Sequence, residues 1–133
     1  MATAAQFAST PVIGSGLLTT ADTSLTSPST VQTIITAGAN GTRIDNIEII
    51  GVANTVAGIV NLFLYNGTTY SLWTQIPVVA NTVSTTALSW RIAMSSVSEP
   101  LILPISLPNT WSLRATTTVS QSGIRVIAYG GNY

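Results

Sequence analysis

Apolar and polar residues alternate along most of this chain, in short segments that turn residues interrupt about every ten positions. A period of two is typical of β-strands, and no segment keeps the i, i+3, i+4, i+7 spacing of an amphipathic helix over three turns. Eight or nine strands are expected, within residues 12–19, 31–37, 43–52, 60–65, 68–73, 85–93, 101–103, 111–117 and 124–129. The pattern predicts an all-β fold, an antiparallel β-sandwich that is a jelly roll or a related arrangement.

A hairpin is the best-defined local feature. Asn66 and Gly67 separate the fourth and fifth of these segments, and an Asn-Gly pair tolerates the positive φ angles that both central positions of a type I′ turn need. The even-numbered residues of segment 60–65 form the expected core face. Phe63 and Tyr65 make its other face unusually apolar.

The alternation slips in one segment, 43–52. Ile44 has one parity, whereas Ile47 has the other, so one extra residue must lie between them. This slip predicts a β-bulge near Asp45 and Asn46, because a bulge restores the register of a strand with its partners.

Glycine interrupts the first segment at Gly14 and Gly16. A phosphate-binding loop would need more glycines, a helix after it and usually a lysine. A bulge or a flexible strand is therefore the favoured interpretation.

Charged residues are scarce, at 6% of the chain against about 25% in a typical soluble domain. The formal net charge is zero, so no basic stripe exists to bind nucleic acid. Hydrophobic residues make up 46% of the chain, which argues against disorder. No run approaches the roughly 18 apolar residues of a membrane-spanning helix. The charged residues are Asp22, Arg43, Asp45, Glu48, Arg91, Glu99, Arg114 and Arg125.

Most catalytic chemistry is excluded by residue type. The chain has no histidine, cysteine or lysine, so it lacks the usual nucleophile–base pairs and zinc ligand sets. Asp45 and Glu48 are the remaining carboxylate pair, and they point to opposite faces of a strand unless the bulge intervenes. We interpret Arg43 and Asp45 as a same-face surface ion pair. No enzyme activity, cofactor or metal is predicted.

The aromatic residues leave two alternatives open. Trp73, Trp90 and Trp111, with several tyrosines, are candidates for core or subunit-interface anchors, where tryptophan and tyrosine are enriched. The same side chains are also candidates for a platform on which sugar rings stack.

The two ends of the domain are expected at residues 11 and 133. Residues 1–10 show no strand pattern and predict a flexible N-terminal arm, in which Ala2, Thr3, Gln6 and Phe7 are candidate docking residues. The N-terminus also lacks the positive and apolar regions of a signal peptide, which favours synthesis in the cytoplasm.

Seven short segments, taken in order, resemble the small capsid decoration (cement) proteins of tailed bacteriophages. The resemblance covers about residues 30–133 and is carried by 41–45 (GTRID), 57–60 (AGIV), 62–67 (LFLYNG), 76–78 (IPV), 100–104 (PLILP), 112–115 (SLRA) and 128–133 (AYGGNY). It implies a β-sandwich or jelly-roll protein on the head surface, often trimeric, that binds the major capsid protein. It supplies no catalytic residue.

The composition agrees with this resemblance. Neutral, threonine-rich strands form contact faces with few charges to desolvate, and a closed trimer covers exposed strand edges. The expected function is therefore a homotrimeric decoration protein that stabilises the capsid, with no role for nucleic acid or membranes. The alternatives are a tail or head-fibre component and a carbohydrate-binding jelly-roll module for host attachment.

Overall fold

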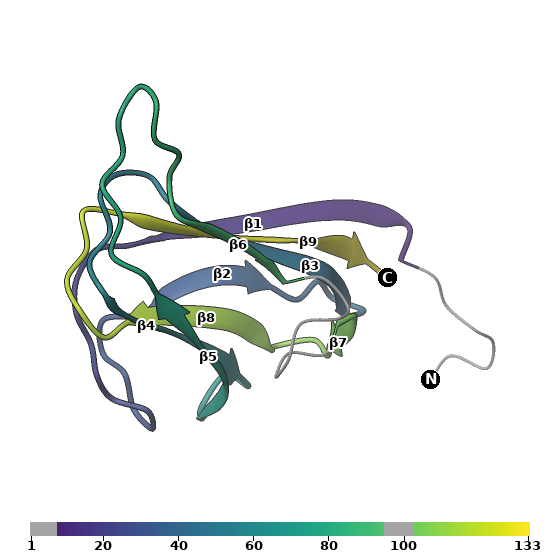
Figure 1. The fold of residues 1–133 in the computed structure, drawn as a ribbon. Helices are drawn as coiled ribbons and strands as arrows, with labels where there is room; N and C mark the ends of the chain where they lie inside the picture. The colour runs from purple at the N-terminus through teal and green to yellow at the C-terminus, as the bar shows by residue number, and fades with distance from the viewer. Residues whose placement is uncertain (1–7, 95–102) are drawn as a thin grey trace.

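Two antiparallel sheets face one another across the core (Figure 1). The structure is a computed structural model that describes residues 8–94 and 103–133, and only the backbone of Ala93 and Met94. No helix occurs within these residues, and the predicted all-β sandwich is confirmed. The strands are β1 (Thr10–Leu18), β2 (Gln32–Thr36), β3 (Thr42–Gly51), β4 (Gly58–Tyr65), β5 (Tyr70–Val78), β6 (Arg91–Met94), β7 (Ile105–Leu107), β8 (Ser112–Thr117) and β9 (Ile124–Asn132).

The strands pair in a nested order around the β4–β5 hairpin. One sheet has the order β1-β9-β3-β6, with β7 also paired to β3, and the other has the order β2-β8-β4-β5. β6 and β7 pair with successive stretches of the same edge of β3. Outward from the hairpin, β3 pairs with β6 and β7, β2 with β8, and β1 with β9. Chain segments far apart in sequence therefore lie side by side throughout.

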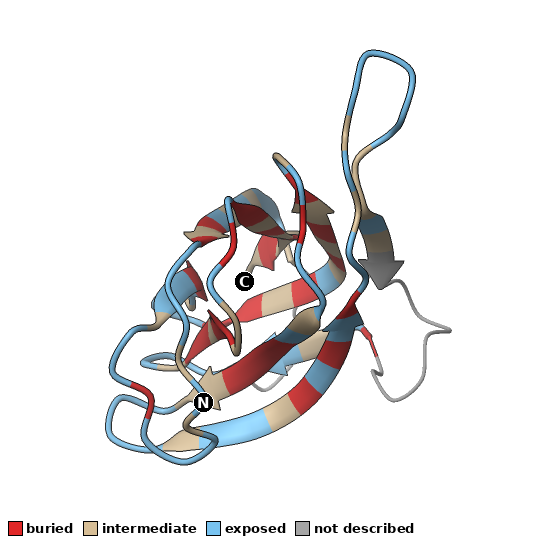
Figure 2. Cartoon of the chain, turned by 60° about the vertical axis from the view of Figure 1, so that its left-hand side comes forward, coloured by how far each residue is buried: buried red, intermediate tan, exposed pale blue. Residues whose placement is uncertain are grey.

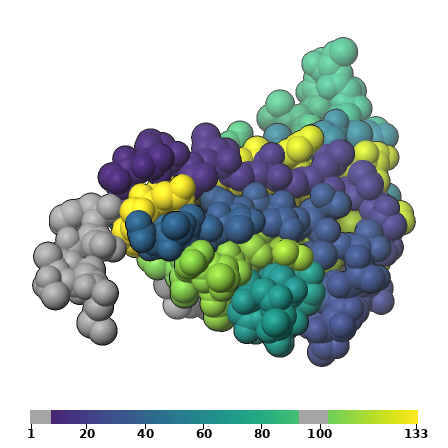
Figure 3. Space-filling model, turned by 180° about the vertical axis from the view of Figure 1, so that it is seen from behind, coloured from purple at the N-terminus to yellow at the C-terminus, as the bar shows by residue number. Residues whose placement is uncertain are grey.

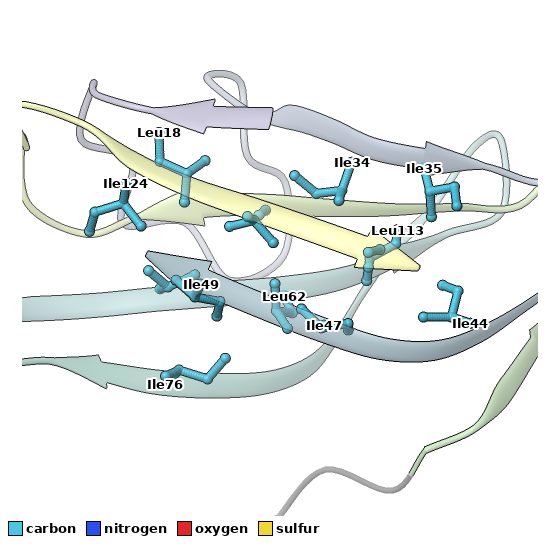
Figure 4. Packing of buried hydrophobic residues seen from close by; sticks show 14 of the residues in the cluster. Leu18, Ile34, Ile35, Ile44, Ile47, Ile49, Leu62, Ile76, Leu113 and Ile124 are labelled. Carbon is cyan, nitrogen blue, oxygen red and sulfur yellow. The ribbon is translucent and has the colours of Figure 1, made fainter. Parts of the chain in front are cut away.

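The core is aliphatic and lies between the sheets (Figure 4). Inward positions alternate with outward ones, as a half-buried sheet requires. The labelled residues of Figure 4 come from seven of the strands and are all buried: Leu18, Ile34, Ile35, Ile44, Ile47, Ile49, Leu62, Ile76, Leu113 and Ile124.

The predicted bulge in β3 is confirmed. The register of β3 with β9 shifts between Ile44 and Asn46, and Ile44 and Ile47 are then both fully buried. Gly130 of β9 lies against this bulge, where a Cβ atom would be 1.7 Å from the carbonyl oxygen of Arg43. Only glycine can be accommodated at that position.

The β4–β5 hairpin forms, but its turn lies one residue later than predicted. Asn66 and Gly67 were expected at the two central positions of the turn. Tyr65 pairs with Tyr70, and the Asn66 N–H donates to the Thr69 carbonyl at 3.3 Å. Gly67 therefore takes the first central position of the turn, with a φ of 101°. Asn66 instead accepts hydrogen bonds through its side-chain oxygen, from the N–H groups of Thr68 and Thr69 at 2.9 and 2.7 Å.

β1 lies against β2 and closes one side of the sandwich (Figure 3). A Cβ atom on Gly14 would lie 2.1 Å from the carbonyl oxygen of Ile34, and one on Gly16 would lie 2.8 Å from the Ile34 Cδ1 atom. β1 pairs with β9 at every position from Thr10 to Leu18 without a register shift. The suggested bulge is therefore wrong, and the glycines permit the close approach to β2 instead.

Two strand predictions differ from the structure. The expected strand 85–93 is strand only from Arg91, because residues 79–90 form a loop that projects from the body (Figure 1). β7 lies where a break was expected, between Pro104 and Pro108, since Thr42 to Ile44 of β3 supply its pairing partners. Leu101 and Ile102 of another expected strand lie outside the described residues.

No helix in the described chain is long and apolar enough to cross a membrane.

Candidate functional site

Exposed aliphatic side chains gather at one end of the sandwich, which we call the loop end. It consists of four connections between the two sheets: residues 19–31, 52–57, 79–90 and 118–123. Asp22 is the one charged residue in these four loops. The exposed aliphatic residues, with their exposed fractions, are Leu25 (41%), Val52 (54%), Val56 (49%), Val79 (61%) and Leu88 (90%).

Loop 79–90 is the most prominent part of the loop end, and it stands out from the body in three views (Figures 1, 2 and 3). Its base is fixed to loop 52–57. Thr55 and Asn81 exchange two backbone hydrogen bonds, of 2.9 and 3.1 Å. The Thr55 hydroxyl donates to the Val79 carbonyl at 2.7 Å, and the Val83 N–H donates to the Asn54 side chain at 2.9 Å. The loop is therefore held in a defined direction.

Among the described residues, the hydrogen bonds of the loop's tip all lie within the loop. The Ser84 hydroxyl oxygen accepts hydrogen bonds from the N–H groups of Thr86 and Ala87, at 3.2 and 3.0 Å. The Asn81 side chain donates to the Leu88 carbonyl at 2.9 Å. These bonds shape a turn that leaves the Leu88 side chain almost fully exposed, so an apolar group is presented to the surroundings rather than to the core.

Loop 118–123 supports loop 52–57 from the other side. Gln121 is buried, and its side-chain amide accepts from the Val56 N–H at 2.8 Å and donates to the Val56 carbonyl at 2.7 Å. A side-chain amide thus takes the place of a paired strand. With its backbone fixed in this way, Val56 keeps its side chain exposed.

Loop 19–31 is organised by one carboxylate. Asp22 accepts hydrogen bonds from the N–H groups of Ser24, Ser29 and Thr30, at 3.0, 2.8 and 2.8 Å. The Thr30 bond, followed by the Ser24 bond, holds the pKa of this carboxyl below its ordinary value of 3.8. The Asp22 N–H also donates to the Thr117 carbonyl at 2.8 Å, which ties the loop to β8. The only charge of the loop end is therefore engaged within its own loop.

Two ion pairs lie on the outer face of the β1-β9-β3-β6 sheet. Arg43 and Asp45 form the predicted pair, with 2.8 Å between Nε and Oδ1, and this prediction is confirmed. Arg91 pairs with Glu48, which also accepts a hydrogen bond from the Tyr129 hydroxyl. Because of the bulge, Asp45 and Glu48 lie on the same outer face, but each carboxylate already forms an ion pair with an arginine. Across residues 8–94 and 103–133, no three His, Cys, Asp or Glu side chains lie close enough to hold a metal ion.

A small cavity lies beside the Arg43–Asp45 pair. It has a volume of about 110 Å³, and Ser9, Pro11 and Gly130 also line it. Pockets for organic ligands usually have volumes of about 300–1,000 Å³, so this cavity is too small for one. This cavity is therefore no candidate for a ligand site.

The three tryptophans lie on separate segments. Trp73 is within β5, and Trp90 and Trp111 directly precede β6 and β8. The Trp90 carbonyl accepts from the N–H of Gly51 and the Trp111 carbonyl from that of Ala37, and these partners lie at opposite ends of the sandwich. All three side chains pack against the core. The structure does not bring them together as a platform.

A different aromatic cluster lies on the outer face of the β2-β8-β4-β5 sheet, and it includes Tyr65 and Tyr70, two of the tyrosines that the sequence offered as interface anchors or sugar-stacking side chains. Phe63 is fully buried there, and Tyr65 and Tyr70 have ring centroids 4.3 Å apart. Arg114 lies 4.1 Å above the centroid of Tyr65. The unusually apolar second face of segment 60–65 was the signal in the sequence that could have found it.

The candidate docking residues Ala2, Thr3, Gln6 and Phe7 lie outside the described residues. The described chain starts at Ala8, and the Ser9 N–H donates to the Asn132 carbonyl at 3.0 Å. β1 begins at Thr10, so pairing with β9 starts within the segment that was expected to be an arm.

No protein-family model matches the sequence, and a search of curated proteins also finds no match.

Proposed function

We propose that this chain is a structural virion protein of the capsid decoration type, which binds the major capsid protein through its loop end and stabilises the shell. The observation that carries the proposal is the set of exposed aliphatic residues on three of the four loops, with Leu88 at 90% exposure on a projecting and internally braced loop. Large exposed apolar patches mark interaction sites, because their burial in a complex releases water.

The electrostatics of the loop end suit a broad, dry contact. Asp22 already receives three N–H donors, so covering this end would leave no unpaired charge of these loops buried. The braced loops also lose little conformational freedom on binding, which lowers the entropic cost of association. Both features favour surface recognition over chemistry, and we propose no enzymatic activity.

The nested strand pairing supports the jelly-roll form of the sandwich. A jelly roll is a long hairpin rolled into two sheets, and here successive pairs close around β4 and β5, alternating between the sheets. In this interpretation β6 and β7 together occupy one strand position beside β3. Among the described residues, the outer edges of β5, β6 and β7 have no paired strand, and contacts between copies in a homotrimer would cover them.

A tail or head-fibre component would use the same loop end against a different virion protein. A carbohydrate-binding module based on the tryptophans has less support, since Trp73, Trp90 and Trp111 pack separately against the core. The decoration role is therefore the function that we propose first.

The proposal is tested by adding purified protein back to phage particles that have been stripped of it. Leu88→Asp places a charge at the proposed contact and should lower binding and the recovery of thermal resistance at least about tenfold, the loss of one well-buried anchor. Ile13→Asp is the matched control, because Ile13 is 70% exposed but lies on β1.

Light scattering of the wild-type protein should give a mass of three chains of 13.8 kDa. Equal losses for Leu88→Asp and Ile13→Asp would refute the loop end as the contact. A monomer at micromolar concentration would refute the trimer, and no binding of the wild-type protein to any particle would refute the decoration role.

A further inference from the structure

The triplet Asn-Gly-Thr occurs twice in the chain, at residues 40–42 and 66–68. When glycine follows asparagine, its backbone nitrogen can approach the side-chain amide closely, because glycine has no side chain to obstruct the attack. Both asparagines are exposed, and both glycines have positive φ angles, 96° at Gly41 and 101° at Gly67. Since the two triplets are identical, a difference in their reactivity in the folded protein reflects the fold.

At Asn40 the backbone nitrogen that would attack is held in place. The Gly41 N–H donates to the Gly38 carbonyl at 3.0 Å, and the Gly41 carbonyl accepts from the Tyr133 N–H at 3.1 Å. The position is also crowded, since a Cβ atom on Gly41 would lie 3.0 Å from the Leu107 carbonyl oxygen. Attack on the Asn40 side chain would therefore have to break the turn that connects β2 to β3.

At Asn66 the nitrogen is accessible and the amide is polarised. Within the described chain the Gly67 N–H forms no backbone hydrogen bond, and a Cβ atom on Gly67 would lie 3.9 Å from the Thr110 carbonyl oxygen. The Asn66 Oδ1 atom accepts from the Thr68 N–H at 2.9 Å, the Thr69 N–H at 2.7 Å and the Thr68 hydroxyl at 3.0 Å. These donors draw electron density away from the amide carbon.

The same donors face the oxygen on which negative charge develops during an attack on the amide. Fixed N–H and O–H donors at such an oxygen lower the barrier to the addition. The Gly67 nitrogen loses its proton to water and bonds to Asn66 Cγ, the Cγ–Nδ2 bond breaks, and Nδ2 takes up a proton and leaves as ammonia. Water then opens the cyclic imide, at Cγ to give aspartate or at the main-chain carbonyl to give isoaspartate.

We propose that Asn66 is a site of spontaneous deamidation in the folded protein, whereas Asn40 is protected. The product has a carboxylate in place of a neutral amide, in a chain whose formal net charge is zero. Position 66 follows Tyr65, whose ring lies under the Arg114 guanidinium, so the new charge arises near a cation. The hairpin lies at the opposite end of β4 from loop 52–57, so this modification neither requires nor excludes the proposed role in decoration.

The aspartate product should keep the turn. A carboxylate oxygen accepts from the Thr68 and Thr69 N–H groups more strongly than an amide oxygen does. Asn66→Asp has the same side chain as this product, and its melting temperature should equal or exceed that of the wild-type protein. A lower melting temperature would contradict the acceptor role of the Asn66 side chain, on which the proposal rests.

The test follows both asparagines in one sample of wild-type protein. The folded protein is incubated at mildly alkaline pH and digested with trypsin, which cuts after Arg43 and places Asn40 and Asn66 in different peptides. Mass spectrometry measures the fraction of each peptide in which the amide has become an acid, and fragmentation locates the change. Asn66 should react at least about tenfold faster than Asn40, because fixed donors stabilise the developing charge. In guanidinium chloride, where both turns are lost, the two rates should become similar.

Thr68→Val and Thr69→Val are a matched pair of variants. The first removes the hydroxyl that donates to Asn66 Oδ1, whereas Thr69 donates to this atom through its backbone N–H, which both variants keep. Thr68→Val should slow the reaction at Asn66 severalfold, and Thr69→Val should leave its rate unchanged. The melting temperature of each variant verifies that it is folded, and the wild-type comparison decides alone if one is not.

The proposal is overturned if Asn40 reacts as fast as Asn66 in the folded protein, or if Thr69→Val slows the reaction as much as Thr68→Val does. It is also overturned if Asn66 stays intact in the folded protein while it reacts in the denatured chain, since the three hydrogen bonds would then hold the amide away from the Gly67 nitrogen. None of these results bears on the add-back of the protein to stripped particles.

Discussion

Two loops of similar composition at the loop end have different conformations: one folds around a buried residue and the other projects from the body. Loop 19–31 and loop 79–90 both cross between the sheets, and both are rich in serine and threonine. The first is gathered around Asp22 and contains a buried residue, Pro28, whereas the second projects with an exposed tip. The two loops differ in their hydrogen-bond acceptor. The Asp22 carboxylate accepts from three N–H groups that are up to eight residues away in sequence, whereas the Ser84 hydroxyl accepts from two N–H groups within three residues of it. One charged acceptor in the sequence therefore separates a folded loop from a projecting one.

The largest effect should come from Asp22→Ala. The substitution frees the N–H groups of Ser24, Ser29 and Thr30, and should cost about 1–2 kcal/mol of unfolding free energy, as the loss of a capping side chain does. Urea unfolding measures this cost, and hydrogen exchange should speed up at those three amides. Ser84→Ala is the matched variant for the other loop and should cost no more than about 0.5 kcal/mol. Equal costs for the two variants would contradict the comparison.

The next effect concerns the base of loop 79–90. Thr55→Val keeps the shape of a buried side chain but removes the hydroxyl that donates to the Val79 carbonyl. Loss of this bond should cost about 1 kcal/mol. Exchange should rise at the Asn81 and Val83 amides and stay unchanged at Thr30. An unchanged stability would mean that the backbone pairing with Asn81 alone fixes the loop.

A smaller effect should appear in acid. The N–H donors lower the pKa of Asp22 in the folded state. The carboxylate therefore stabilises the fold fully above the ordinary, unfolded pKa of 3.8, and this contribution is lost as the pH falls through the lower, folded value. Asp22→Asn keeps an acceptor oxygen and cannot titrate. The difference in melting temperature between wild type and Asp22→Asn, measured from pH 6 to pH 2, should therefore narrow below about pH 4. A difference that stays constant over this range would show that Asp22 does not contribute through its charge.

The sequence was a good guide where strands have one buried face. The alternation in β3 and β4 reflects burial of alternate residues such as Ile47, Ile49 and Leu62, and the slip near Asp45 marked a bulge because misplaced isoleucines would otherwise face water. Both patterns result from burial of one face of each strand in the core. They can therefore be recognised in the sequence without knowing which strands pair.

Features that depend on distant partners could not be predicted in this way. Thr85 and its neighbours favour strands by type, but a strand needs a neighbouring strand to pair with. Within the described chain, residues 79–90 form a β-bridge only at Asn81, next to the body. β7 lies between two prolines, and the nearby β3 edge decides its conformation. Gly14 is explained only by the approach of Ile34. The aromatic cluster around Arg114 likewise assembles from three strands, so no local motif announces it.

The smallest effect on stability should come from Leu88→Ser at the tip of loop 79–90. The side chain is almost fully exposed, so its removal gives up almost no buried apolar area, and the free energy of unfolding should change by less than about 0.5 kcal/mol. The braces at Asn81 and Asn54 do not involve this side chain, so exchange at the base of the loop should also stay as it is. A loss of more than about 1 kcal/mol would mean that the tip folds onto the body in solution, and the contrast between the two loops would disappear. Leu88→Ser should also weaken attachment to stripped particles. If it does so while the free energy of unfolding stays the same, the Leu88 side chain contributes to the contact with the particle and not to the stability of the fold.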